Sequence, residues 1–167
     1  CHLSIGQEAI PVGISQFLTD KDYIYGNHRS HGHYLALGGS AYKLIAEVLG
    51  KMDGCSKGMG GSMHLTSLNN GFIGSVPIVA GTIPIALGSA FASKIKMENS
   101  IAVSYFGDGA TEEGVFHESL NFASQYNAPI LFVCENNMFS SHMHISERQI
   151  YDSTARFAEV HGISNIL

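Results

Sequence analysis

Basic residues are scarce in this sequence, and those present are scattered along it. The 167 residues include nine Lys and Arg against fourteen Asp and Glu, which gives a formal net charge of −5 and a pI near 5.9. Proteins that grip nucleic-acid phosphates concentrate Lys and Arg in a patch or stripe. Because no such stripe is present, we expect no nucleic-acid partner.

Cysteines are few and have no regular spacing. Cys1, Cys55 and Cys134 are odd in number and far apart. Small secreted domains held by disulfides carry an even set, and cysteine zinc sites carry a CxxC pair. The pattern therefore indicates reduced thiols in a reducing compartment, either a bacterial cytoplasm or an organelle matrix, and it argues against secretion.

Long apolar runs, internal repeats and charge blocks are also missing. No stretch approaches the roughly 18 apolar residues that span a membrane, and no signal peptide is visible, so we expect no membrane association. A chain of this length suits one α/β domain over residues 1–167 that buries about 70% of its unfolded surface. Residue 1 is Cys and a helical pattern begins near Gly6, so we interpret the chain as an excerpt of a longer subunit.

Two short apolar segments predict neighbouring strands. Residues 101–106 (IAVSYF) and 129–134 (PILFVC) have the composition of parallel strands buried on both faces. Between them, residues 111–125 place apolar side chains at helical spacing. The unit is a strand, a tight turn, a helix and a strand, so the fold class is α/β, with a parallel sheet flanked by helices.

Other segments complete the predicted secondary structure. Residues 54–74 are rich in Gly and Ser and are predicted to form a loop of unusual length, which is more often functional than inert. Helices are predicted at residues 7–18, 31–37, 41–49, 84–95, 112–125 and 151–160.

Polar residues stand where the two predicted strands end. Asp108, in a Gly-Asp-Gly triplet, follows the first strand, and Asn137 follows the second. Parallel sheets bind ligands at this carboxyl edge, and carboxylate and amide oxygens suit Mg²⁺. Gly109 lets the backbone approach a ligand closely. Ala110 and Thr111 are predicted to open the next helix, whose N–H groups and positive dipole end favour an anion such as a diphosphate.

This arrangement resembles the thiamin diphosphate fingerprint, in which a Gly-Asp-Gly triplet is followed by a helix, a strand and an Asn pair. Counting Ala110 through Glu135 gives 26 residues between the triplet and the pair. A lone triplet is usually an ordinary turn, whereas the strand, helix, spacing and Asn pair together are specific. Three further blocks occur in the order seen in α subunits of 2-oxo acid dehydrogenase E1 components: residues 2–9 (HLSIGQEA), 28–32 (HRSHG) and 57–64 (KGMGGSMH). The last block is similar to the pyruvate and acetoin dehydrogenase branches.

The resemblance implies residues for the metal and the phosphates. Asp108 and Asn137 would bind Mg²⁺ through their side chains, and Phe139 would bind it through the main-chain carbonyl. Gly109 and Ala110 would lie at the diphosphate. Taken by itself, Arg29 is more typical of a surface residue, but its family counterpart holds the terminal phosphate as a bidentate fork. His28 stands where the family often has a phosphate-binding Tyr.

The resemblance also assigns residues 74–82 (GSVPIVAGT) to the aminopyrimidine ring of the cofactor. The carbonyl of Pro77 and the N–H of Val79 would bind the ring, and the side chain of Ile78 would lie beneath it. The family commonly has Gly at Pro77; proline loses a donor but keeps the carbonyl acceptor. The alternative is an ordinary turn before a helix.

Three histidines match family residues that line the active centre, namely His2, His31 and His64. An imidazole there can hold a proton for, or donate one to, an oxygen that becomes negative. A structural role remains the alternative for each histidine.

Two histidine pairs, His31/His33 and His142/His144, also allow a zinc interpretation. No third ligand stands at a characteristic spacing, and residues i and i+2 share a face only in a strand. Zinc is therefore the less favoured interpretation.

By this resemblance, the chain would be part of an E1 α subunit that uses thiamin diphosphate and Mg²⁺. The reaction implied is oxidative decarboxylation of a pyruvate-like 2-oxo acid, with acyl transfer to a lipoyl group on an E2 acyltransferase. The glutamate that activates the cofactor comes from an E1 β subunit in such enzymes, so an α2β2 assembly is expected and the chain alone should be inactive. Residues 82–95, rich in small residues, match a family helix at the subunit interface. Two alternatives stay open: a transketolase-like thiamin diphosphate enzyme, and a non-catalytic subunit that holds Mg²⁺ and a diphosphate.

Overall fold

The computed structural model describes residues 1–167, and its contacts divide the chain into two compact units, Cys1–Ile78 and Val79–Leu167. Both units combine parallel strands with helices, which confirms the predicted α/β class. One domain over residues 1–167 stays a prediction. None of the helices has the length and apolar character needed to cross a membrane.

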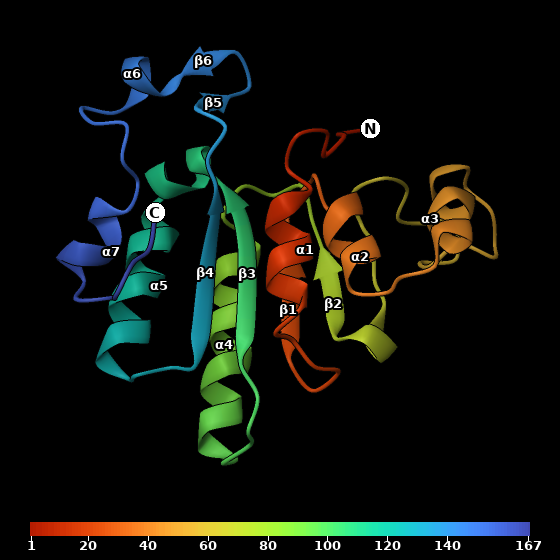
Figure 1. Cartoon of the computed structure of the whole chain (residues 1–167), viewed down its shortest axis with the longest axis horizontal. Helices are drawn as coiled ribbons and strands as arrows, with labels where there is room; N and C mark the ends of the chain where they lie inside the picture. The colour runs from red at the N-terminus through yellow and green to blue at the C-terminus, as the bar shows by residue number, and fades with distance from the viewer. The chain divides into compact units, whose positions relative to one another are not determined.

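The first unit is built on a parallel pair of short strands (Figure 1). Tyr34 and Phe72 are fully buried in its core, with their rings edge to face at 6.3 Å. The elements are helix α1 (Ala9–Ser15), strand β1 (Tyr23–Gly26), helices α2 (His31–Ala36) and α3 (Ala41–Val48), the 3₁₀ turn η1 (Leu68–Asn70) and strand β2 (Phe72–Ser75).

The second unit contains the predicted strand, turn, helix and strand. Strand β3 (Ala102–Gly107) pairs in parallel with β4 (Ile130–Glu135), and helices α4 (Thr82–Ile95) and α5 (Gly114–Gln125) pack together beside them (Figure 1). The remaining elements are η2 (Asp108–Glu112), β5 (Phe139–Ser140), β6 (Met143–His144), α6 (Ile145–Arg148) and α7 (Arg156–Val160).

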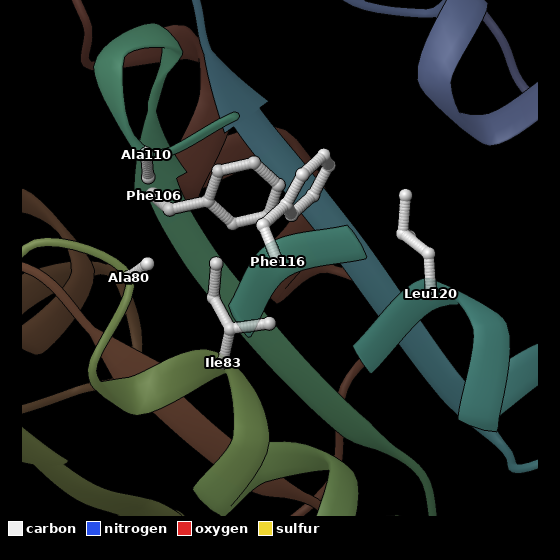
Figure 2. Packing of buried hydrophobic residues seen from close by; sticks show 6 residues of the cluster. All are labelled: Ala80, Ile83, Phe106, Ala110, Phe116 and Leu120. Atoms are coloured by element: carbon white, nitrogen blue, oxygen red, sulfur yellow. The ribbon is translucent and has the colours of Figure 1, made fainter. Parts of the chain in front are cut away.

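An apolar cluster lies beneath the turn that follows β3. Figure 2 shows Ile83 of α4 pointing toward the rings of Phe106 and Phe116, whose centroids are 5.3 Å apart. Ala110, in the turn itself, is buried in the same cluster. Packing of this kind stabilises by about 25 cal/mol per Å² of apolar surface removed from water. The core therefore holds the backbone next to Asp108 in place.

The prediction that Ala110 and Thr111 open a helix is wrong. Residues Asp108–Glu112 form a 3₁₀ turn, and α5 begins only at Gly114, after the extended residue Glu113. The Thr111 hydroxyl donates to the carbonyl of Asp108 at 2.7 Å, and such a local bond competes with a regular helix. The 3₁₀ turn therefore separates Asp108 from the N-terminus of α5.

Two other boundaries and the burial of one strand differ from the sequence prediction. The expected loop 54–74 contains η1 and the start of β2, because Phe72 pairs with β1. The last helix begins at Arg156 rather than near residue 151, because the guanidinium of Arg156 binds the carbonyls of Tyr151 and Ser153 in a turn. Strand β4 is mostly half-buried, and Leu131 on it is 42% exposed, so it is not covered on both faces in this chain.

Candidate functional site

The register of β3 and β4 brings two polar segments to one edge of the second unit. The last pair in the register is Gly107 with Glu135. Asp108 and the Asn136–Asn137 pair follow directly, so they leave the two strands side by side. The predicted meeting of the strand ends is thereby confirmed.

The two carboxylate oxygens of Asp108 have different environments. The side chain is 1% exposed. A guanidinium nitrogen of Arg148 donates to Oδ2 at 2.5 Å, while Oδ1 is buried and has no hydrogen-bond partner. A buried carboxylate oxygen without a donor is costly, and a bound cation is one way to satisfy it.

Arg148 belongs to a polar network that ties α6 to the turn after β3. It also forms an ion pair with Glu112, and its Nε donates to the carbonyl of Met143 at 3.2 Å. Gln149 donates to Thr111 and Glu112 at 3.1 and 2.8 Å. The network therefore holds residues of η2 through side chains that lie 36 to 40 positions later in the sequence.

The Asn pair forms two consecutive turns. The Oδ1 atom of Asn136 accepts from the N–H of Met138 at 2.9 Å, and Oδ1 of Asn137 accepts from Phe139 at 3.0 Å. Met138 has a left-handed φ of 68°, and its carbonyl accepts from the N–H of Ile145. Since an amide oxygen has two lone pairs, Asn137 keeps one acceptor position, held in a fixed direction.

These groups fit a hard divalent cation. Oδ1 of Asp108 and Oδ1 of Asn137 are oxygen donors on adjacent strand ends, and Mg²⁺ commonly takes only a few protein oxygens. A Cβ at Gly109 would lie 2.6 Å from the hydroxyl of Ser140, so glycine keeps this turn close to β5. Phe139 belongs to β5, where it pairs with His144. Its role as a carbonyl ligand stays a prediction.

In the first unit, three predicted site residues lie together. The rings of His2 and His28 meet edge to face at 4.7 Å. Arg29 donates from its guanidinium to the carbonyl of Leu3 at 2.6 Å, and its own N–H binds Oδ1 of Asn27. Arg29 as a whole is half-buried, and its guanidinium has further N–H donors for an anion.

The other two predicted histidines are both tied to the loop that follows α3: His31 begins α2 and contacts this loop, and His64 lies within it. Nε2 of His31 lies 3.1 Å from the carbonyl oxygen of Ser62 and 2.8 Å from its hydroxyl. The N–H of His64 donates to the carbonyl of Gly60 at 3.2 Å. The structure therefore places the His31 side chain, from α2, against Ser62, two positions before His64.

The zinc interpretation has no geometric support. No group of three or more His, Cys, Asp or Glu side chains is placed to hold a metal ion in the chain. His33 is buried and binds the hydroxyl of Ser30 at 3.0 Å, which is a structural role. His144 accepts from the N–H of Ser146 at the start of α6. A magnesium site can be built on one carboxylate, so it does not need a group of three such side chains.

The segment expected at the aminopyrimidine ring has exposed apolar side chains. Ile78 is 71% exposed and Val79 is 53% exposed, while Pro77 is half-buried. Exposed apolar side chains of this kind are available to a flat apolar ligand. Their assignment to the ring stays a prediction.

Sequence reasoning missed Arg148 as a partner of Asp108. It lies 40 residues away in a four-residue helix, and no local pattern marks it. It also missed the buried carboxylate of Glu47 on α3. An acidic residue within an apolar helix face was the one available signal.

Comparison with known proteins gives one family over the whole chain. A family described as "Dehydrogenase E1 component" matches residues 1–167. The α subunit of an acetoin:2,6-dichlorophenolindophenol oxidoreductase from Bacillus subtilis (strain 168) is 40% identical over 165 residues, which is 99% of this chain and 50% of that protein.

Pyruvate dehydrogenase α subunits are equally similar. The mitochondrial E1 component subunit α of Solanum tuberosum is 42% identical over 139 residues, 83% of this chain and 36% of that protein. The E1 component subunit α of Rhizobium meliloti (strain 1021) is 41% identical over 140 residues, 84% of this chain and 40% of that protein. The chain thus spans half or less of the relatives it matches.

Proposed function

The chain belongs to the dehydrogenase E1 component family, and from that membership we propose that it is the metal- and diphosphate-binding part of an E1 α subunit. The complete subunit would take part in oxidative decarboxylation of a pyruvate-like 2-oxo acid and acyl transfer to a lipoyl group. Relatives named for pyruvate and for acetoin support this branch of the family equally. The observation that carries the proposal is the buried, unpartnered Oδ1 of Asp108 beside Asn137.

The proposed cofactors are thiamin diphosphate and Mg²⁺. When bound, thiamin diphosphate would supply the carbon that attacks the 2-oxo acid and the electron sink for the electron pair left by the loss of CO₂. Asp108 and Asn137 would hold Mg²⁺ by their side chains, and Phe139 by its carbonyl. Gly109 and Ala110 would lie at the diphosphate, and His28 and Arg29 would bind the terminal phosphate.

The chain's own residues would then supply position and charge. Arg148 holds Oδ2 of Asp108 and leaves Oδ1 free, so the metal ligand needs no reorientation when the cation arrives. The guanidinium of Arg29 would offer a fork to a phosphate. Pro77, Ile78 and Val79 would hold the aminopyrimidine ring. His2, His31 and His64 would hold or donate protons at substrate oxygens.

The proposed partners are an E1 β subunit and a lipoylated E2. The relatives are named as α subunits, which supports a second chain in the assembly. Helix α4 presents Ile85, Gly88 and Ala92 to solvent at helical spacing, and Ile85 is 55% exposed. A stripe of small and apolar residues permits close helix packing, so we propose that this face of α4 contacts the β subunit. The relatives are bacterial and mitochondrial, which supports a bacterial cytoplasm or an organelle matrix.

Calorimetry of thiamin diphosphate binding, with and without Mg²⁺, tests the site. In the full-length subunit mixed with its β partner, Asp108→Ala should weaken Mg²⁺-dependent binding at least about 100-fold, because it removes the only carboxylate ligand. Asp152→Ala makes the same chemical change at an exposed position of the second unit and should bind like the wild type. Wild-type affinity in the Asp108 variant would refute the assignment.

An assay with separate acceptors distinguishes the alternatives. Acyl transfer to a lipoylated E2 domain supports the E1 proposal, whereas transfer to an aldose acceptor alone would support a transketolase-like enzyme. Bound cofactor without turnover on any 2-oxo acid would support the non-catalytic subunit.

A further inference from the structure

A carboxylate is fully buried in the first unit without a cationic partner. Glu47, on α3, is 0% exposed. Its two oxygens accept four backbone N–H groups from the loop that follows α3. The donors are Ser56 at 2.7 Å and Gly58 at 2.9 Å to Oε2, and Gly60 at 2.6 Å and Gly61 at 3.2 Å to Oε1. A buried charge is costly unless it is satisfied in this way.

The backbone conformation of this loop directs its N–H groups toward the Glu47 carboxylate. Lys57, Gly58 and Gly61 have left-handed φ values of 59°, 77° and 57°. Lys57 is not a glycine, so its left-handed backbone conformation is strained and persists only where the surrounding structure holds it. A Cβ at Gly54 would lie 2.3 Å from Oε2 of Glu47, so the loop passes directly over the carboxylate.

The same loop carries the contacts of two predicted active-centre histidines. Ser62, one residue beyond Gly61, holds Nε2 of His31 through both its carbonyl oxygen and its hydroxyl. The Ser56 hydroxyl donates to the carbonyl of His64 at 2.8 Å. A chain of direct contacts therefore runs from Glu47 through the loop to His31 and to His64.

We propose that Glu47 is a positioning residue of the active centre, whose carboxylate folds the glycine loop around itself and thereby sets the positions of His31 and His64. The inference rests on the proposed function, since it concerns the histidines that the reaction would use. A protonated Nε2 of His31 donates to the Ser62 carbonyl, which leaves Nδ1 as the nitrogen free for other work. Glu47 acts only through the loop.

A positioning role for Glu47 and a purely structural role predict different effects of a substitution. A residue that only stabilises the fold would change the free energy of unfolding and leave the local loop and the chemistry of the remaining folded molecules alone. A positioning residue changes the local order of the loop and the turnover number while the second unit still binds metal and diphosphate. Measurements on the folded complex therefore separate the two roles.

Glu47→Gln is the sharpest variant, because the carboxamide has nearly the same shape but only one acceptor oxygen. Its NH₂ group would face two backbone N–H donors, and both would lose their acceptor, because each oxygen of Glu47 accepts two N–H groups. Glu118→Gln, at an exposed position of α5, is the matched control. Both variants are made in the full-length subunit and assembled with the β partner.

Three readouts are taken on these complexes: hydrogen exchange of the peptide spanning residues 54–64, calorimetry of thiamin diphosphate with Mg²⁺, and kcat and KM with pyruvate and with acetoin as probes. Glu47→Gln should speed exchange in the loop at least about tenfold and lower kcat at least about tenfold. Cofactor affinity should stay within about threefold of the wild type. The Glu118 variant should match the wild type in all three.

Unchanged exchange, or faster exchange with an unchanged kcat, would overturn the role of Glu47. A wild-type complex that binds no thiamin diphosphate would instead overturn the proposed function, and this inference with it. If Glu47→Gln does not fold, Ser62→Ala replaces it, since it keeps the carboxylate and removes only the hydroxyl contact to His31. That variant should lower kcat and shift its pH profile with exchange unchanged, and wild-type values of both would overturn the part of the proposal that concerns His31.

Discussion

At the scale of single residues, Asp108 and Arg148 form a buried ion pair in the second unit. Both side chains are buried, at 1% and 6% exposed. Breaking a buried pair by removing one partner typically costs about 3–5 kcal/mol, because the other charge is left uncompensated.

Arg148→Met should therefore lower the free energy of unfolding by about 3–5 kcal/mol, measured by urea titration of the full-length subunit. Adding Asp108→Asn to that variant removes the stranded charge, so the double variant should lose less than the sum of the two single losses. Strict additivity would show that the two side chains do not interact.

Cys134 lies at the end of β4, close to the proposed metal site. Burial raises the pKa of its thiol to about 11; a hydrogen bond from Thr154 lowers it, and the charges of Asp108 and Glu135 add to the rise. Only about a thousandth of the thiol is then ionised at pH 8, and the thiolate is the reactive form.

Alkylation with iodoacetamide at pH 8 should therefore leave Cys134 unmodified in the native protein and modify it fully in urea, as judged by mass spectrometry of the peptides. Fast native labelling of Cys134 would contradict the raised pKa of its thiol.

Glu47 should also leave a signature in the pH dependence of stability. Burial works to raise the pKa of its carboxyl, but the N–H groups of Gly58, Ser56, Gly60 and Gly61 together outweigh burial and hold the pKa below its usual value. A carboxyl whose pKa is lowered in the folded state contributes stability above its unfolded pKa and loses it as pH falls through the folded pKa.

The wild type should therefore lose stability relative to Glu47→Gln as pH falls below about 4.5, the ordinary value for the group. Urea titrations of both proteins between pH 7 and pH 3 measure the difference. A difference in unfolding free energy that stays constant over this range would show that Glu47 does not titrate with a lowered pKa.

At the scale of secondary-structure elements, α4 has two faces of different character. One buries Ile83, Ala86, Leu87 and Ala90 within the unit, and the other exposes Gly88 and Ala92, with no atom within 4 Å of a Cβ built at Gly88.

Ala92→Glu should weaken association with the β subunit at least about tenfold, because it would bury an unpaired charge in a close helix contact. Asn121→Glu adds the same charge at an exposed position of α5 and should associate normally. Sedimentation velocity of the mixed subunits measures both. Normal association of the Ala92 variant would remove α4 from the interface.

Element predictions succeeded where the local pattern was strong. The apolar runs of β3 and β4 and the helical spacing of α5 lie close to their predicted positions, as do α2 and α3. Strand β2 was hidden because it is four residues long and contains a glycine, and only its pairing with β1 makes it a strand. The short α6 likewise depends on contacts made by Arg148 and Ile145, which no local pattern reports.

At the scale of the whole molecule, the chain covers half or less of the length of its relatives. One relative is named for reduction of 2,6-dichlorophenolindophenol, which provides a direct assay. Under the proposed function, the full-length subunit with a β subunit should reduce this dye in the presence of a 2-oxo acid or acetoin, and the subunit alone should not, because the proposed activating glutamate comes from the β subunit. Turnover by the subunit alone would contradict the shared-site proposal.

The sequence by itself determined the family, the α/β class and the two strand ends that carry Asp108 and Asn137. These follow from local patterns and motif spacing, which are properties of neighbouring residues. Only the tertiary structure decided which oxygen of Asp108 is left free, that Arg148 holds the other, and that Glu47 gathers four N–H groups of the glycine loop. Those contacts join residues that are 9 to 40 positions apart, and their geometry exists only once burial has removed water as the competing partner.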